Sequence, residues 1–138
     1  MEGDEFSWPV RVFIEDTDAG GIVYYVNYLK FMERARTEYL RSMGHNKAGA
    51  NPGSHQFVVH AADIKYKKPA YLDDELCVTA AVTKCTAASV WFSQSVWRGE
   101  VLLSEAEIKI ACVDGATLKP MPIPSELALD LKLSLDAN

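Results

Sequence analysis

The clearest pattern in this chain is an alternation of hydrophobic and polar positions with a period of two residues. Alternation of this kind is typical of β-strands that bury one face and leave the other face more polar. It recurs in four runs, which predict strands over residues 56–67, 75–84, 89–98 and 101–113. An earlier stretch, 8–14, is rich in branched and aromatic residues, and its Pro9 suits an edge strand or a strand start. Short connections between the later runs favour antiparallel neighbours.

A second pattern, with a helical period, extends from Asn27 to Gly44 and predicts one long helix. Asn27 is the expected N-cap, and Gly44 stands where a C-terminal glycine cap belongs. Arg36 falls inside the hydrophobic arc, either as an ion-pair partner of Glu33 or as a long side chain that reaches water. The hydrophobic side of the helix comprises Tyr28, Phe31, Met32, Ala35, Tyr39, Leu40 and Met43. A stripe of this width must be buried, most simply against a sheet.

The order of these elements predicts an α+β fold in a single domain over residues 1–138. One strand comes first, then the long helix, then four strands, and a short C-terminal helix over 125–133. We expect the five strands to form one antiparallel sheet around the long helix. Because one helix cannot cover both faces of such a sheet, the surface that remains predicts an oligomer.

Composition and charge exclude several classes of function. The chain has 138 residues, a formal net charge of −5 and no cluster of Lys and Arg, so we expect no nucleic-acid partner. No hydrophobic run is long enough to span a membrane, and the acidic N-terminus lacks the order of a signal peptide. These features predict a cytoplasmic protein that does not span a membrane.

The three cysteines, Cys77, Cys85 and Cys112, match neither a disulfide framework nor a zinc-binding spacing. We interpret them as buried thiols in a reducing compartment. No three potential ligands have the spacing of a metal site. We therefore expect neither a metal nor another cofactor.

The segment that precedes the long helix carries the candidate chemistry. Three acids, Glu15, Asp16 and Asp18, lie within four residues and are followed by two glycines. The first turn of a helix exposes backbone N–H groups and the positive end of the helix dipole, which can stabilise a developing oxyanion. An acid held beside it can act as a nucleophile or a general base. Ordinary loops and caps contain the same residue types, so the residues alone leave both interpretations open.

This segment closely resembles the signature of the 4-hydroxybenzoyl-CoA thioesterase family, and especially its YbgC-like branch. The matching residues are 15–24, 27–28 and 31–41, with further matches at 64–66, 68–70, 72–74, 111–114 and 122–124. The resemblance implies the hotdog fold, in which a five-stranded antiparallel sheet wraps a long helix. It also implies an acyl-CoA thioesterase that forms a homodimer or a homotetramer.

By this resemblance, Asp18 matches the catalytic carboxylate, which either attacks the thioester carbonyl or activates a water molecule. Tyr25 matches the position whose backbone N–H polarises that carbonyl. Many YbgC-like members carry histidine there and some aromatic-CoA thioesterases carry tyrosine, so the acyl group stays open. Asp16 and Glu15 are instead expected to be loop, cap or ion-pair residues.

Two other functions are compatible with such a fold. A hotdog hydratase usually pairs a histidine with an acid. No histidine lies near this loop, which argues against that activity. A non-catalytic scaffold would bind acyl groups or an acyl carrier protein without hydrolysis. Lys65, Lys67 and Lys68 either meet CoA phosphates or form a solvated strand end, and His60 is expected to be a core histidine.

Overall fold

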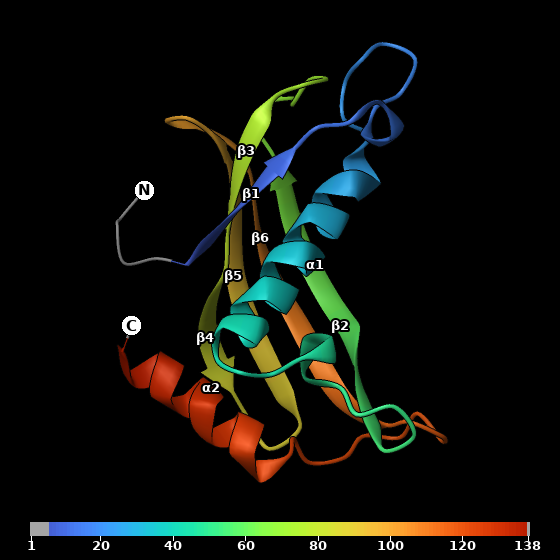
Figure 1. Ribbon diagram of the computed structural model, residues 1–138, viewed down its shortest axis with the longest axis vertical. Coiled ribbons are helices and arrows are strands. Elements are labelled where there is room, and N and C mark those ends of the chain that lie inside the picture. The colour runs from blue at the N-terminus through green and yellow to red at the C-terminus, as the bar shows by residue number, and fades with distance from the viewer. Residues whose placement is uncertain (1–5, 138) are drawn as a thin grey trace.

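One antiparallel sheet and a long helix packed on it make up most of the computed structural model, which describes residues 6–137 (Figure 1). The strands are β1 Ser7–Arg11, β2 His55–Tyr66, β3 Glu75–Thr79, β4 Ala81–Cys85, β5 Ser89–Arg98 and β6 Val101–Asp114. The helices are α1 Tyr25–Ser42 and α2 Ser125–Ala137, with 3-10 turns at η1 Ile14–Asp16 and η2 Lys47–Gly49. The predicted α+β class and the order of the elements are confirmed.

All strand pairs of the sheet are antiparallel, in the order β1-β3-β5-β6-β2, and β4 also pairs with β5. The predicted strand 75–84 is divided at Ala80 into β3 and β4, because side chains interrupt the ladder there. The Ser95 N–H donates to Thr79 Oγ1 at 2.9 Å, and the Gln94 amide donates to the Thr79 carbonyl at 3.1 Å. The sheet therefore has the five positions expected from the sequence, one of them filled by two short strands.

Helix α1 lies against one face of the sheet and encloses the hydrophobic core with it (Figure 1). The predicted hydrophobic stripe is the buried side of the helix, and its largest fully buried side chains are Tyr28, Phe31 and Met32. Phe92 on β5 and Ile108 on β6 are fully buried opposite them. Burial of hydrophobic surface contributes about 25 cal/mol per Å², so this contact between helix and sheet is a major source of stability.

The start of α1 differs from the sequence prediction. The helix begins at Tyr25, because Tyr24 is the extended N-cap residue, with φ −69° and ψ 139°. Asn27 already lies in the first turn and is buried. The prediction that Asn27 caps the helix is therefore wrong, and its amide makes a different contact, described below.

The end of α1 follows the prediction. Gly44 has a φ of 93°, a left-handed conformation that favours glycine. The N–H of Gly44 donates to the Arg41 carbonyl at 2.9 Å, and the N–H of His45 donates to the Leu40 carbonyl at 3.0 Å. These two bonds form a Schellman motif, so the predicted glycine cap is confirmed.

Strand β2 is at one end of the sheet and is exposed along residues 58–63. It pairs with β6 on one side, and no described strand pairs with its other edge. Val59 is 55% exposed, and the ladder changes register around His60. His60 is itself exposed, so the prediction of a core histidine is wrong for the single chain. Proteins usually cover an edge of this kind.

Helix α2 extends from Ser125 to Ala137, beyond the predicted limit at residue 133. Leu127 and Leu131 bury its inner side, and Asp130 Oδ2 lies 2.6 Å from His45 Nε2 just beyond α1. In Figure 1, α2 is at the opposite end of the molecule from the first turn of α1. No helix within residues 6–137 is long and apolar enough to cross a membrane.

Candidate active site

The acidic segment ahead of α1 folds into a small hairpin that leads directly into the helix. Thr17 and Val23 close the hairpin with an antiparallel bridge. Within it, the Asp18 N–H donates to the Ile22 carbonyl at 2.9 Å, and the Gly21 N–H donates to the Asp18 carbonyl at 3.1 Å. Gly21 has a φ of 76°. This is a type I turn followed by a left-handed residue, a common closure of three-residue hairpins.

Asp18 opens this turn and uses one carboxylate oxygen in it. Oδ1 accepts a hydrogen bond from the Gly20 N–H at 2.9 Å, which forms an Asx turn. The other oxygen has no partner among the described residues, and the side chain is exposed. The turn therefore fixes the direction of a carboxylate that keeps one oxygen free to accept a proton or to attack a carbon atom.

The first turn of α1 presents backbone N–H groups without partners. Tyr25 is the first helical residue, and neither its N–H nor that of Val26 has an acceptor within residues 6–137. No side chain caps the helix at Tyr24, and no acid lies in the first turn. The positive end of the helix dipole thus meets no compensating charge there, which suits an anion or a carbonyl oxygen that gains negative charge.

Asp16 and Asn27 connect the hairpin to the start of the helix. The Asp16 carbonyl accepts the Tyr24 N–H at 3.2 Å and Asn27 Nδ2 at 2.7 Å. Its carboxylate accepts the Phe13 N–H at 2.9 Å, so Asp16 is a loop residue, as expected. Asn27 is the member of this group that the sequence interpretation missed. The available signal was its helical position, four residues before buried Phe31 and hence on the same side.

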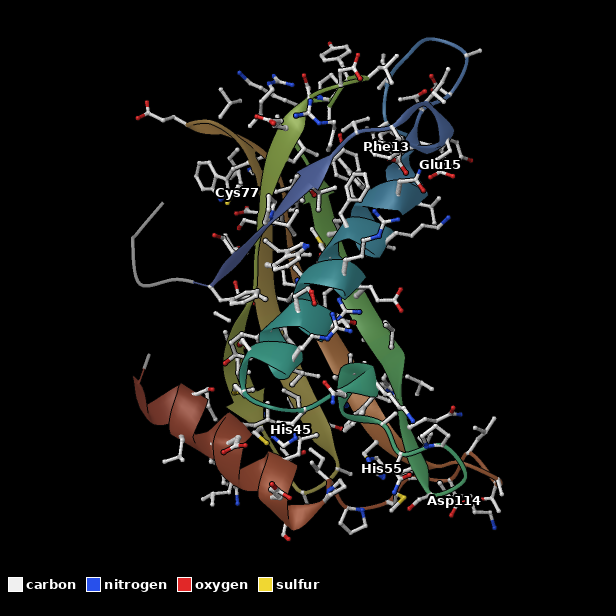
Figure 2. All side chains as sticks on the ribbon, viewed as in Figure 1. Phe13, Glu15, His45, His55, Cys77 and Asp114 are labelled. Carbon is white, nitrogen blue, oxygen red and sulfur yellow. The ribbon has the colours of Figure 1, made fainter. Side chains whose placement is uncertain are left out.

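Glu15 lies at the same end of the molecule as Phe13, beside the first turn of α1 (Figure 2). It is exposed and makes no ion pair with the described residues. Of the three neighbouring acids, Asp16 is buried, and its carboxylate accepts a backbone N–H. Asp18 has a fixed carboxylate with one free oxygen, and Glu15 has no fixed direction.

A pocket of about 300 Å³ lies where the start of α1 meets the end of β2. It is lined by Ile22, Val23, Tyr25, Tyr28, Tyr66, Lys67, Lys68 and Pro69. The ring of Tyr66 lies 4.7 Å from that of Tyr25 and 5.4 Å from that of Tyr28, measured between centroids. The Tyr66 hydroxyl also donates to the Tyr25 carbonyl at 3.3 Å. Asp18 does not line the pocket, but its turn partner Ile22 does.

Burial affects two of the tyrosines that line this pocket. Burial raises the pKa of Tyr28, against the smaller effect of the Ala70 N–H that donates to its hydroxyl at 2.9 Å. Partial burial also raises the pKa of Tyr66, together with the nearby Tyr25. The pocket therefore offers aromatic faces, and the hydroxyl groups of Tyr28 and Tyr66 stay protonated.

Two of the three candidate lysines reach this pocket. Lys67 and Lys68 line it, whereas Lys65 lies in a separate hollow with Asp63 and Glu105. Lys67 Nζ is 3.6 Å from a Glu105 carboxylate oxygen, and the Lys68 ammonium has no partner among the described residues. Within residues 6–137, no group of three His, Cys, Asp or Glu side chains is arranged to hold a metal ion.

Comparison with known families identifies the protein class. The model of the thioesterase superfamily matches residues 20–105, more than half of the chain. The chain belongs to the thioesterase superfamily. The matched residues include the two glycines of the hairpin turn, all of α1, and the pocket residues at and just after the end of β2.

Two relatives place this thioesterase more closely. The acyl-CoA thioesterase YbgC of Haemophilus influenzae is 45% identical over 128 residues, which cover 92% of this chain and 94% of that protein. The acyl-CoA thioester hydrolase YbgC of Escherichia coli O157:H7 is 41% identical over 128 residues, covering 92% of this chain and 96% of that protein. The predicted resemblance to the YbgC-like branch is confirmed.

Solved structures agree with the fold of the thioesterase. A hypothetical protein from Aquifex aeolicus has a TM-score of 0.82 at 31% identity, over 91% of this chain and 98% of that one. A probable thioesterase from Bartonella henselae has a TM-score of 0.79 at 32% identity, over 86% and 98%. The expected hotdog fold is confirmed, and so is the expected class of enzyme, a thioester hydrolase.

Proposed function

We propose that this thioesterase hydrolyses acyl-CoA thioesters to a free acid and CoA. The observation that carries the proposal is the N–H of Tyr25, which has no acceptor among the described residues. Tyr25 lines the pocket, and the first turn of its helix is hydrogen-bonded to the hairpin that contains Asp18. Thioester cleavage needs a donor for the oxyanion and a carboxylate or activated water for the attack. The names of the two YbgC relatives support CoA as the carrier.

In one route, Asp18 is the nucleophile. Its free carboxylate oxygen attacks the carbonyl carbon of the thioester, and the Tyr25 N–H stabilises the resulting oxyanion. Collapse of this intermediate breaks the C–S bond, expels CoA as a thiolate and leaves an anhydride between the acid and Asp18. Water hydrolyses the anhydride and restores the Asp18 carboxylate, and its two protons pass to the CoA thiolate and to solvent.

In the other route, Asp18 is a general base. It takes a proton from a water molecule that attacks the same carbon atom, and it returns that proton to the CoA sulfur. Repeated turnover in ¹⁸O-labelled water separates the two routes. Hydrolysis of an anhydride on the Asp18 side leaves label in that carboxylate, which mass spectrometry of the peptide detects, whereas the base route leaves Asp18 unlabelled.

Release of the CoA thiol from aromatic, short and long acyl-CoAs tests the activity. We expect Asp18→Asn to lower kcat by about 10³-fold or more, as loss of one member of a catalytic set does in other hydrolases. The matched control is Glu15→Gln, which neutralises a neighbouring exposed acid and should keep the wild-type kcat. A folded Asp18→Asn variant with wild-type turnover would assign the chemistry to another group.

A second candidate is a non-catalytic scaffold that binds acyl groups or an acyl carrier protein. Its support is the Asx turn, which gives Asp18 a structural purpose independent of catalysis. Lys67 and Lys68 at the pocket suit either CoA phosphates or an acidic carrier protein. Thioesters of both carriers should be compared in the same assay. A folded protein that releases no thiol from either would favour the scaffold.

We further propose that the thioesterase is a homodimer, with a homotetramer as the alternative. The unpaired edge of β2 and the exposed Val58 and Val59 form a surface that a second β2 strand would cover. Tyr66 ends this strand and also lines the pocket. A second copy on the β2 edge would therefore provide a further wall of the same pocket.

Two more proposals concern the chain as a whole. We propose that it is cytoplasmic, because the number and spacing of its cysteines match no disulfide framework, as is usual in a reducing compartment. We also treat residues 1–138 as one domain, since α2 packs on β4 of the same sheet that encloses α1. Limited proteolysis should then yield no stable fragment smaller than the sheet with both helices.

A further inference from the structure

We propose that Asn27 is a positioning residue of the thioesterase reaction, an inference that rests on the proposed function of Asp18 and Tyr25. Asn27 is 7% exposed and lies in the first turn of α1, two residues after Tyr25. Its Nδ2 donates to the Asp16 carbonyl at 2.7 Å, across eleven positions of the chain. It therefore joins the helix that bears the oxyanion donor to the limb of the hairpin that bears the carboxylate.

The acceptor of this bond is a junction between the two halves of the site. The Asp16 carbonyl, two residues before Asp18, accepts from both Asn27 and Tyr24. Tyr24 directly precedes Tyr25, and its N–H bond to this oxygen is the longer of the two, 3.2 Å against 2.7 Å. The Asn27 amide is thus the closer connection between the hairpin and the helix.

The two limbs of the hairpin are supported differently. The exit limb is bonded to the segment 70–72, through the Val23 N–H to the Ala70 carbonyl at 2.9 Å and the Leu72 N–H to the Gly21 carbonyl at 3.1 Å. The entry limb, which carries Asp18, has no such backbone bond to the segment 70–72 among the described residues. Its connection to the helix is the Asp16 carbonyl, which the Asn27 amide holds.

The consequence of losing this bond is a shift of the carboxylate rather than loss of the pocket. Asn27→Asp turns the donor into an acceptor that faces the Asp16 carbonyl, so the two oxygens repel each other. The Asn27 side chain makes no hydrogen bond to the tyrosines or lysines that line the pocket among the described residues. A displacement of about 1 Å between reacting groups lowers a rate by about 10²-fold, so kcat should fall while KM changes little.

The experiment measures kcat and KM for Asn27→Asp with an acyl-CoA that the wild type hydrolyses. We expect kcat to fall by about 10²-fold with little change in KM. The matched control is Gln94→Glu, because Gln94 is another buried amide that donates to an α1 carbonyl, that of Met32, at 2.9 Å. Its new carboxylate faces Arg36, whose Nη1 donates to Gln94 Oε1 at 2.8 Å, so this control should stay folded and keep the wild-type kcat. A folded Asn27→Asp variant with wild-type kcat would overturn the inference.

A second variant covers the case in which Asn27→Asp does not fold. Asn27→Ala removes the donor without adding a charge, and we expect amide hydrogen exchange to accelerate in residues 16–24 while the sheet stays protected. A smaller fall in kcat should accompany this change. Unchanged exchange in the hairpin, or unchanged kcat, would contradict the proposal.

A double variant keeps this test separate from the test of the mechanism. If Asn27 acts through Asp18, adding Asn27→Asp to Asp18→Asn should lower kcat no further. Losses that multiply would mean that Asn27 acts elsewhere and would overturn the inference. Failure of the proposed function is recognised independently, as full activity of Asp18→Asn alone or as no activity of the wild type.

Discussion

At the scale of single residues, the proposed role of Asp18 requires one carboxylate to serve both a turn and a reaction. Oδ1 is bonded to the Gly20 N–H, while the other oxygen is free. Asparagine also forms Asx turns, because its side-chain oxygen accepts the same hydrogen bond. It lacks the charge and the second acceptor oxygen that nucleophilic attack or proton transfer requires. The two demands on Asp18 are therefore separable by substitution.

Asp18→Asn and Asp18→Ala should differ in stability, although we expect both to be inactive. We expect Asp18→Asn to unfold within about 0.5 kcal/mol of the wild type, since the turn bond survives. Asp18→Ala loses that bond and should be about 0.5–1.5 kcal/mol less stable. Urea denaturation followed by circular dichroism measures both values. Equal stability of the two variants would show that the Asx turn contributes nothing.

The variant Tyr25→Pro removes the proposed oxyanion donor together with the Tyr25 ring. The first helical position tolerates proline, and the extended backbone of Tyr24, at ψ 139°, is compatible with a proline after it. Because the Tyr25 N–H has no partner in the described chain, Tyr25→Pro deletes no structural hydrogen bond. We expect kcat to fall by about 10²–10³-fold at nearly unchanged melting temperature.

The control for this variant is Tyr25→Ala, which removes the same ring but retains the backbone N–H. It should keep most of kcat, and any effect should fall mainly on KM, because the ring lines the pocket. If Tyr25→Pro and Tyr25→Ala have the same kcat, the backbone N–H does not stabilise the transition state.

At the scale of elements, the sequence predicted the helices and strands that depend on local patterns. It missed the features that depend on tertiary contacts. The alternation of hydrophobic and polar residues predicts the strands, and the helical period predicts α1. Each pattern arises because the segment buries one face. The break between β3 and β4 needs Gln94 and Ser95, which belong to a different strand. Asn27 resembled an N-cap, and its true partner, Asp16, is brought to it only by the folded hairpin. The roles predicted for Asp18 and Tyr25 came from a family resemblance rather than from any local pattern.

The β3–β4 break makes a prediction of its own. Thr79→Val keeps the shape of a fully buried side chain but leaves the Ser95 N–H without its acceptor. Loss of one partner from a buried hydrogen bond costs about 1–3 kcal/mol, and because this bond is only partly buried we expect a value near the lower end. Thr83→Val is the matched control, because Thr83 is exposed and its hydroxyl contact to the Trp91 carbonyl is long, at 3.4 Å. Urea denaturation measures both variants. Equal losses in the free energy of unfolding would argue against a structural role of Thr79 at the break between β3 and β4.

At the scale of the whole molecule, the unpaired edge of β2 separates into two parts. Residues 58–62 are exposed valines and alanines around His60. The residues that follow include the charged Asp63, Lys65 and Lys67. Charged residues on an edge strand discourage pairing with other strands. The hydrophobic part is therefore the section of β2 on which a second copy should be centred.

A charge in that section should separate the subunits. We expect Val59→Asp to yield a folded monomer by light scattering, with greatly reduced thioesterase activity because the pocket lacks its second wall. Leu129→Asp is the matched control, since Leu129 is 59% exposed on α2 and lies outside the β2 edge. A Val59→Asp variant that stays oligomeric would place the interface elsewhere.

The same edge also has a consequence for the time course of folding. Strand β2 becomes a rigid template only after β6, made later in the chain, has paired along its inner side. In the proposed dimer, two chains would meet edge to edge only after each has folded, so assembly would be a separate bimolecular step. Refolding followed by hydrolytic activity should therefore show a phase that quickens with protein concentration, while the recovery of β-sheet signal does not.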